Sequence, residues 1–181
     1  THNIPLLRAV IDHEKFTSGN FSTKFLAEEY PDGFQGIALS AAHRKQIAAI
    51  TASMFLRKQQ TAATVGLDHG AVVPEDGEYV VGIDGEQQHL SVFSALDDEA
   101  TEFMDELDTS GEHNFLVSFH GDDGELAEHM DLSAKIDDAA GLVRMPDLDL
   151  QVHSYTATGA KVSVFGQIFD VSVLSPLQAS L

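Results

Sequence analysis

The chain contains nine histidines and many carboxylates, which are the side chains that could do chemistry here. The chemistry that they suggest is metal binding. Four groups in the sequence could supply metal ligands. They are Asp68 with His69; His113; His120 with Asp122 and Asp123; and His129 with Asp131. None has the spacing of a known zinc motif, and Glu128-His129 lacks a second histidine at the helical offset. We therefore expect structural or surface roles for these side chains and no metal site.

The acidic run from Asp122 to Glu125 is the nearest approach to a calcium loop. A calcium-binding loop needs alternating acidic ligands and a closing glutamate twelve positions along, and this run does not follow that order. A turn is the better interpretation of the run.

Motifs for nucleophilic catalysis and phosphate binding are absent from the sequence. The chain has no cysteine, no Gly-x-Ser-x-Gly elbow and no Gly-rich phosphate loop of either common type. We expect no catalytic and no cofactor-binding residue, and without disulfides the fold must be held by packing.

Charge is distributed unevenly along a chain whose net charge is -19. Residues 1–58 hold seven Lys and Arg against five Asp and Glu, whereas residues 59–181 hold three against 24. The acidic part would repel phosphate backbones and anionic lipids, so we expect neither a nucleic-acid nor a membrane partner. No apolar run approaches the roughly 20 residues that a membrane-spanning helix needs.

Two short helices are predicted near the start of the chain. Asn3 can cap a helix with Pro5 in its first turn, whose apolar face is formed by Ile4, Leu7, Val10 and Ile11. A second is predicted from Ser22 to Tyr30, before Pro31-Asp32-Gly33 breaks it.

The strongest helix signal covers residues 40–60. Ser40 can cap this helix, five alanines favour it, and neither Gly nor Pro interrupts it. Its broad apolar surface is formed by Ile47, Ile50, Met54, Phe55 and Leu56. Such a helix must be covered on most of its sides.

After Gln60 the sequence changes to short alternating segments that are typical of antiparallel strands. They are Glu78–Ile83, His89–Ser94, Phe115–His120, Leu148–Tyr155, Lys161–Phe165 and Ile168–Leu174. Gly166-Gln167 suits a hairpin turn between the last two. Residues 97–112 could form a short acidic helix, and residues 122–147 are only weakly strand-like.

Two stretches of the chain carry a resemblance to a known family. The first comprises His2 to Leu7, then Asp12, His13 and Phe16, and then the run from Gly19 to Phe34; the second is Gln151 to Leu181, with Gly166, Phe169, Val171, Val173 and Leu174. The first resembles the end of the biotin carboxylase domain in α subunits of biotin-dependent acyl-CoA carboxylases of the propionyl-CoA type. The second is similar to the last strands of the docking domain (BT domain) of that subunit.

The resemblance implies an α+β fold in which a long central helix is surrounded by an antiparallel β-barrel of about eight strands, preceded by short helices. Residues 1–36 would be the end of the biotin carboxylase domain, and residues 37–181 the docking domain. Within it, the resemblance and the patterns together predict a helix over 40–60, a hook loop over 61–77 and the barrel over 78–175.

The resemblance also implies a function. The parent enzyme is an ATP-dependent ligase that uses biotin, ATP and Mg²⁺, and its β subunit transfers the carboxyl group to an acyl-CoA. This chain lacks the biotin-accepting Met-Lys-Met motif and the ATP-binding core, so we expect it to be non-catalytic, with no cofactor of its own. Its expected partners are the carboxyltransferase β subunit and the biotin carboxylase and biotin carrier modules of the same subunit, in a bacterial cytoplasm or a mitochondrial matrix.

The hook loop is the part that the resemblance assigns to contact with the β subunit. Its predicted interface residues are Val65, Leu67, His69, Val72 and Val73, which are mainly apolar in a segment without a core of its own. Two alternatives stay open, a stand-alone small metal-binding barrel and a barrel that binds a ligand in an open interior.

Overall fold

The computed structural model describes residues 3–34, 36–65, 74–94, 111–121 and 123–181. Three short helices come first: α1 (Ile4–Ile11), α2 (Glu14–Thr17) and α3 (Phe25–Glu29). The long helix α4 (Ala41–Val65) follows them. The strands are β1 (Asp76–Ile83), β2 (Glu86–Ser94), β3 (Glu112–His120), β4 (Leu126–Asp137), β5 (Leu142–Arg144), β6 (Asp149–Thr156), β7 (Gly159–Val164) and β8 (Gln167–Leu174), and the short helix α5 (Pro176–Ala179) comes last.

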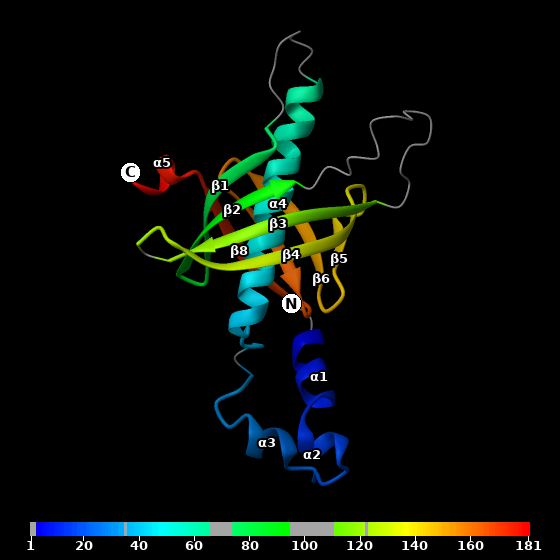
Figure 1. Ribbon diagram of the computed structural model, residues 1–181. Coiled ribbons are helices and arrows are strands. Elements are labelled where there is room, and N and C mark those ends of the chain that lie inside the picture. The colour runs from blue at the N-terminus through cyan, green and yellow to red at the C-terminus, as the bar shows by residue number, and fades with distance from the viewer. Residues whose placement is uncertain (1–2, 35, 66–73, 95–110, 122) are drawn as a thin grey trace.

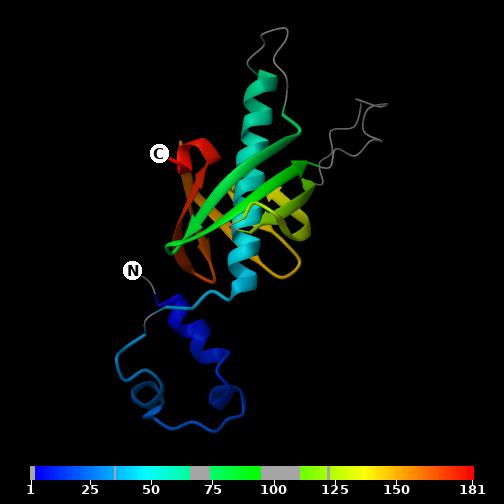
Figure 2. The same ribbon diagram turned by 60° about the vertical axis from the view of Figure 1, so that its left-hand side comes forward.

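The eight strands form a closed antiparallel barrel in which each strand pairs with its neighbours in the sequence. The ring is closed by β1 and β8, which pair from Val80 opposite Leu174 to Ile83 opposite Val171. Helix α4 runs through the middle of this barrel, and α1 to α3 gather beyond one of its ends (Figures 1 and 2). The predicted fold class, a central helix inside an antiparallel barrel, is therefore confirmed.

The central part of α4 is buried on every side. From Ile47 to Met54 no residue is more than 4% exposed, and the alanines in this stretch are completely buried. Small side chains let the surrounding strands approach the helix backbone closely. Two hydroxyls within this apolar surrounding are satisfied inside the helix: Thr51 Oγ1 donates to the carbonyl of Ile47 at 2.7 Å, and Ser53 Oγ to that of Ala49 at 2.8 Å.

The strands supply the rest of the core through period-two alternation, with one side chain inward and the next outward. Buried positions facing α4 include Val81, Leu90, Val92, Val117, Leu150, Val162, Val164 and Val171. Most are β-branched or leucine, which pack well on a pleated surface. The barrel interior is thus filled by one helix and the inward side chains, as expected for a barrel of this size.

The helices before the barrel have a small aromatic cluster of their own. Phe25 is buried, and the rings of His13, Phe21 and Tyr30 meet it edge-on. This segment also contacts the barrel, because the Arg8 guanidinium lies 4.8 Å from the centre of the Phe165 ring in the β7–β8 turn. The helical segment is therefore attached to the barrel at the β7–β8 turn.

Several element ends differ from the prediction. Helix α4 continues to Val65, five residues beyond the predicted end, because Thr61 to Val65 contain no Gly or Pro to stop it. Ser40 caps α4 as predicted, accepting a bond from the His43 amide, whereas the side chain of Asn3 makes no cap bond to α1.

The predicted helix from Ser22 to Tyr30 is shorter and forms α3, and α2 was not predicted. The β7–β8 turn is centred on Phe165 and Gly166, both with positive φ, and not on Gly166 and Gln167. Two residues with positive φ are typical of the tight hairpin turns that match strand twist.

Candidate functional site

The end of the barrel from which α4 emerges is the candidate functional site. Beyond Leu56 the helix leaves the barrel, and Lys58, Gln59, Thr61, Ala62 and Thr64 are exposed. Both ribbon views show this end projecting past the strands (Figures 1 and 2). A hollow of about 510 Å³ lies at its base, lined by Met54, Arg57, Lys58, Thr61, Ala62, Asp138 and Tyr155. We call it the helix-exit hollow.

Tyr155 reaches the hollow because β6 contains a bulge. Val152 pairs with Val162 on β7, but Ser154 pairs with Lys161, so His153 is an extra residue. His153 and Ser154 are both exposed, and Tyr155 returns to the inner side, where its ring lies 5.9 Å from that of Phe55. If His153 were paired as an ordinary residue of the ladder, regular alternation after Val152 would turn Tyr155 outward.

Contacts with α4 fix the Tyr155 ring on both its hydroxyl and its face. The hydroxyl donates to Sδ of Met54 at 3.7 Å, and the Lys58 ammonium lies 3.7 Å from the ring centre, a cation–π contact. Burial raises the pKa of Tyr155 to about 12, with a smaller contribution from the charge of Asp138. Tyr155 is therefore a neutral hydrogen-bond donor at neutral pH.

An ion pair closes the side of the hollow. Arg57 Nη1 lies 2.9 Å from Oδ2 and 3.2 Å from Oδ1 of Asp138, which belongs to the turn after β4. The Arg57 side chain is 26% exposed and that of Asp138 66% exposed. An exposed pair of this kind adds about 1 kcal/mol or less to stability, so its effect is mainly to hold the guanidinium at the rim.

A second tyrosine borders the place where α4 leaves the barrel. Tyr79 is 6% exposed, and its hydroxyl lies 3.5 Å from Oε1 of Gln59. Burial, with a smaller contribution from Asp76, raises its pKa to about 12 as well. Tyr79 and Tyr155 therefore contact α4 where its buried part gives way to its exposed part.

The predicted interface residues belong to the segment that follows this helix end. Val65 is the last residue of α4, and its side chain lies outside the described part of the chain. Leu67, His69, Val72 and Val73 also lie outside the described residues. The hook-loop assignment stays a prediction, with the finding that its first five residues are helical.

The described histidines that were considered as metal ligands lie beside serine hydroxyls or an aromatic ring. Nε2 of His120 is 2.8 Å from Oγ of Ser91, and Nδ1 of His129 is 3.0 Å from Oγ of Ser118, on the outer surface of β2 to β4. The rings of His113 and Phe115 are 6.4 Å apart. Asp68, His69 and Asp122 lie outside the described residues. Across the described ranges, no group of three or more histidines and carboxylates is arranged to hold a metal ion.

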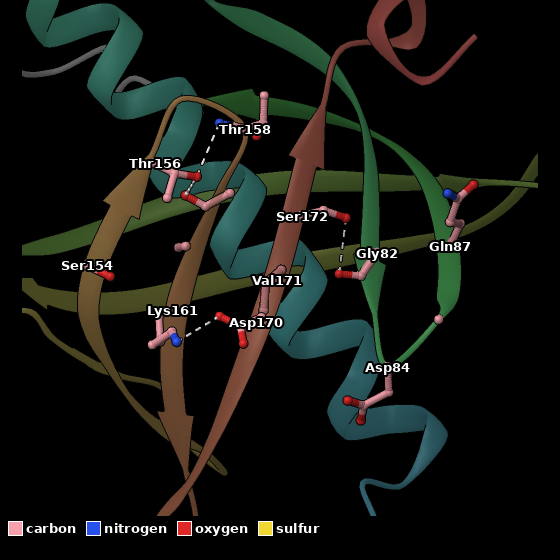
Figure 3. Close-up of a pocket in the computed structure, with 13 residues that line it drawn as sticks. Gly82, Asp84, Gln87, Ser154, Thr156, Thr158, Lys161, Asp170, Val171 and Ser172 are labelled. Carbon is pink, nitrogen blue, oxygen red and sulfur yellow. Dashed lines mark hydrogen bonds and ion pairs between the residues drawn. The ribbon is translucent and has the colours of Figure 1, made fainter. Parts of the chain in front are cut away.

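A second hollow lies on the outer face of the barrel, and Figure 3 shows the side chains around it. It measures about 390 Å³ between β6, β7, β8 and the β1–β2 turn. Its walls hold the Lys161–Asp170 ion pair at 3.3 Å and a Ser172 hydroxyl that donates to the carbonyl of Gly82 at 3.4 Å. At Gly159 a Cβ would lie 2.3 Å from the carbonyl oxygen of Val171, so close strand packing accounts for the small residue there.

The comparison with known proteins can now be set beside this geometry. The fold defines the class: an eight-stranded antiparallel barrel filled by a single helix, with an exposed helix end. No protein-family model matches the chain.

About a third of the chain is similar to propionyl-CoA carboxylase alpha chains. It is 52% identical over 62 residues to the mitochondrial protein of Mus musculus and 48% identical over 62 residues to that of Homo sapiens, which in each case is 34% of this chain. The Ruegeria pomeroyi protein is 51% identical over 53 residues, or 29% of this chain. These matches span only 8 to 9% of the length of the relatives. The resemblance seen in the sequence is therefore confirmed.

Within the described residues, none of the helices combines the length and the apolar character needed to cross a membrane.

Proposed function

We propose that this chain is the subunit-docking part of the α subunit of a biotin-dependent acyl-CoA carboxylase of the propionyl-CoA type. Residues 1–36 would be the end of its biotin carboxylase domain, and residues 37–181 the docking domain. The partner would be the carboxyltransferase β subunit. In this proposal the chain carries out no chemistry, and biotin, ATP and Mg²⁺ bind to other modules of an ATP-dependent ligase in a bacterial cytoplasm or a mitochondrial matrix.

Two observations support the proposal. The chain is similar to alpha chains of propionyl-CoA carboxylase, and its central helix extends past the barrel to expose Lys58, Gln59, Thr61, Ala62 and Thr64. Most helix stability comes from tertiary packing, so the exposed turns of α4 add little to the stability of the barrel. Their presence is better explained by a role outside the barrel. A surface that projects from a rigid scaffold is well suited to binding another protein chain.

Docking would act on the reaction through position. Holding the α and β subunits together makes the transfer of carboxybiotin between two active sites an intramolecular event with a high effective concentration. A rigid barrel around α4 would keep the contact surface in one orientation relative to the modules on either side. Less ordering is then needed on association, which favours affinity.

The ligand-binding alternative requires an empty barrel interior, and α4 occupies that interior. The metal-binding alternative can be tested directly by titrating the chain with Zn²⁺ or Ca²⁺ in a calorimeter. Stoichiometric binding would favour it over docking.

The docking proposal is tested by co-purifying the full-length α subunit with its β subunit. The double variant Leu67→Asp, Val73→Asp should abolish co-purification, because two carboxylates would be placed in an apolar contact. The matched control is Leu126→Asp, Leu177→Asp, which adds the same charge at leucines that are 50% and 74% exposed outside the predicted hook loop. Equal association of both double variants would contradict the assignment of the hook loop.

A further inference from the structure

The helix-exit hollow joins an apolar wall to two cations in an otherwise acidic part of the molecule. Met54, Ala62 and the ring of Tyr155 provide the apolar wall, and Arg57 and Lys58 provide the charge. Downstream of these two residues the sequence has only three further Lys and Arg against 24 Asp and Glu. The hollow is therefore a concave site with two cations, whereas most charged residues after Lys58 are acidic.

Both cations are held in place at the rim. Lys58 lies over the Tyr155 ring, and Arg57 is bound by Asp138. The Asp138 contact uses Nη1 of Arg57, whereas a guanidinium carries five N–H donors in a fixed plane, so Arg57 can bind a second carboxylate at the same time. A carboxylate entering here meets donors that have already lost much of their conformational freedom.

The bulge in β6 is a second, independent indication that the hollow is a binding site. The extra residue His153 places Tyr155 beside α4 at the rim. Bulges are over-represented at barrel rims and beside functional sites, where they redirect one side chain. Tyrosine and arginine are also the residue types that dominate binding energy in protein interfaces.

We propose that the helix-exit hollow receives an apolar side chain of the carboxyltransferase β subunit, flanked by an Asp or Glu of that subunit which binds Arg57 and Lys58. This inference rests on the proposed docking function and adds the chemistry of the partner. Charge complementarity argues for such an acidic-apolar anchor. It argues against a second copy of this chain, because two copies with a net charge of -19 each repel one another.

The test measures the affinity of the full-length α subunit for its β subunit. Ala62→Trp fills the hollow from an exposed helix position and should weaken binding at least about tenfold. The matched control is Ala42→Trp, since Ala42 is exposed at the opposite end of α4 and should leave binding unchanged. Lys58→Glu should weaken binding and make the remaining affinity less dependent on salt, whereas Lys58→Arg should retain it. Circular dichroism melts verify that each variant is folded.

The outcomes separate this inference from the proposed function. If the wild-type subunits bind and Ala62→Trp and Lys58→Glu bind equally well, the hollow is not the anchor site, although docking stands. If the wild-type α and β subunits do not associate, the docking function is wrong, and the inference that depends on it is wrong too. Self-association of the α subunit that Ala62→Trp removes in sedimentation experiments would identify a second copy as the occupant and overturn the inference.

Discussion

The two halves of α4 lie in opposite surroundings. Ile47 to Met54 are enclosed by the barrel, whereas Lys58 to Thr64 project beyond it. The 25 residues of α4 make a helix of about 37 Å, at 1.5 Å per residue. A strand of eight residues is about 26 Å long and, tilted by about 40°, covers only about 20 Å of the barrel axis. The helix is therefore longer than its enclosure, and the surplus length forms a surface.

The largest effect is expected in the buried half. Ile50 is completely buried within the barrel, so Ile50→Ala should lower the free energy of unfolding by about 2–5 kcal/mol. Thr64→Ala in the exposed half should change it by about 0.5 kcal/mol or less. Urea denaturation followed by circular dichroism measures both. Similar losses for the two variants would erase the distinction between the halves.

An intermediate effect is expected where the two halves meet. Tyr155→Ala removes the half-buried ring that contacts Phe55 and Met54 and should cost about 1–3 kcal/mol. His153→Ala is the control, because His153 is the exposed extra residue of the bulge and contributes little packing. A loss at His153 as large as that at Tyr155 would mean that the bulge residue itself, and not the ring it positions, stabilises this end of the barrel.

The smallest effect at neutral pH concerns the two tyrosines beside the helix exit. Their pKa values are raised to about 12 in the folded chain, against about 10 for an unfolded tyrosine. Between about pH 10 and 12 the folded state therefore binds more protons than the unfolded state, so stability falls as the pH rises through this window. Tyr155→Phe should reduce the slope of unfolding free energy against pH without abolishing it, since Tyr79 remains. An unchanged slope would show that Tyr155 is not protected by burial.

Much of the barrel could be predicted from the sequence because its strands alternate. β1, β2, β3 and β8 contain the predicted segments, and β6 and β7 overlap theirs except for one residue at an end, Leu148 and Phe165. β4 and β5 were only weakly indicated. The first six residues of β4, Leu126 to Asp131, include no buried position, so no inward-outward alternation marks them as a strand.

The helix-exit hollow could not be predicted for a different reason. Lys58, Asp138 and Tyr155 come from a helix, a turn and a strand that are far apart in the sequence. Tyr155 also depends on the bulge at His153, and a bulge is a property of pairing between two strands that no local pattern reveals. What the sequence did offer was the pair of cations Arg57 and Lys58 close to the predicted helix end.

The charges at both ends of the buried stretch have a further consequence for how long the fold persists. Arg44 and Lys45 precede this stretch, and Arg57 and Lys58 follow it, so sliding α4 along its axis would carry cations through an apolar interior. Sliding of α4 out of the barrel is therefore unfavourable in both directions. Release of the helix requires two neighbouring strands to separate along their length, and the lifetime of the native state is set by the rate of that rupture.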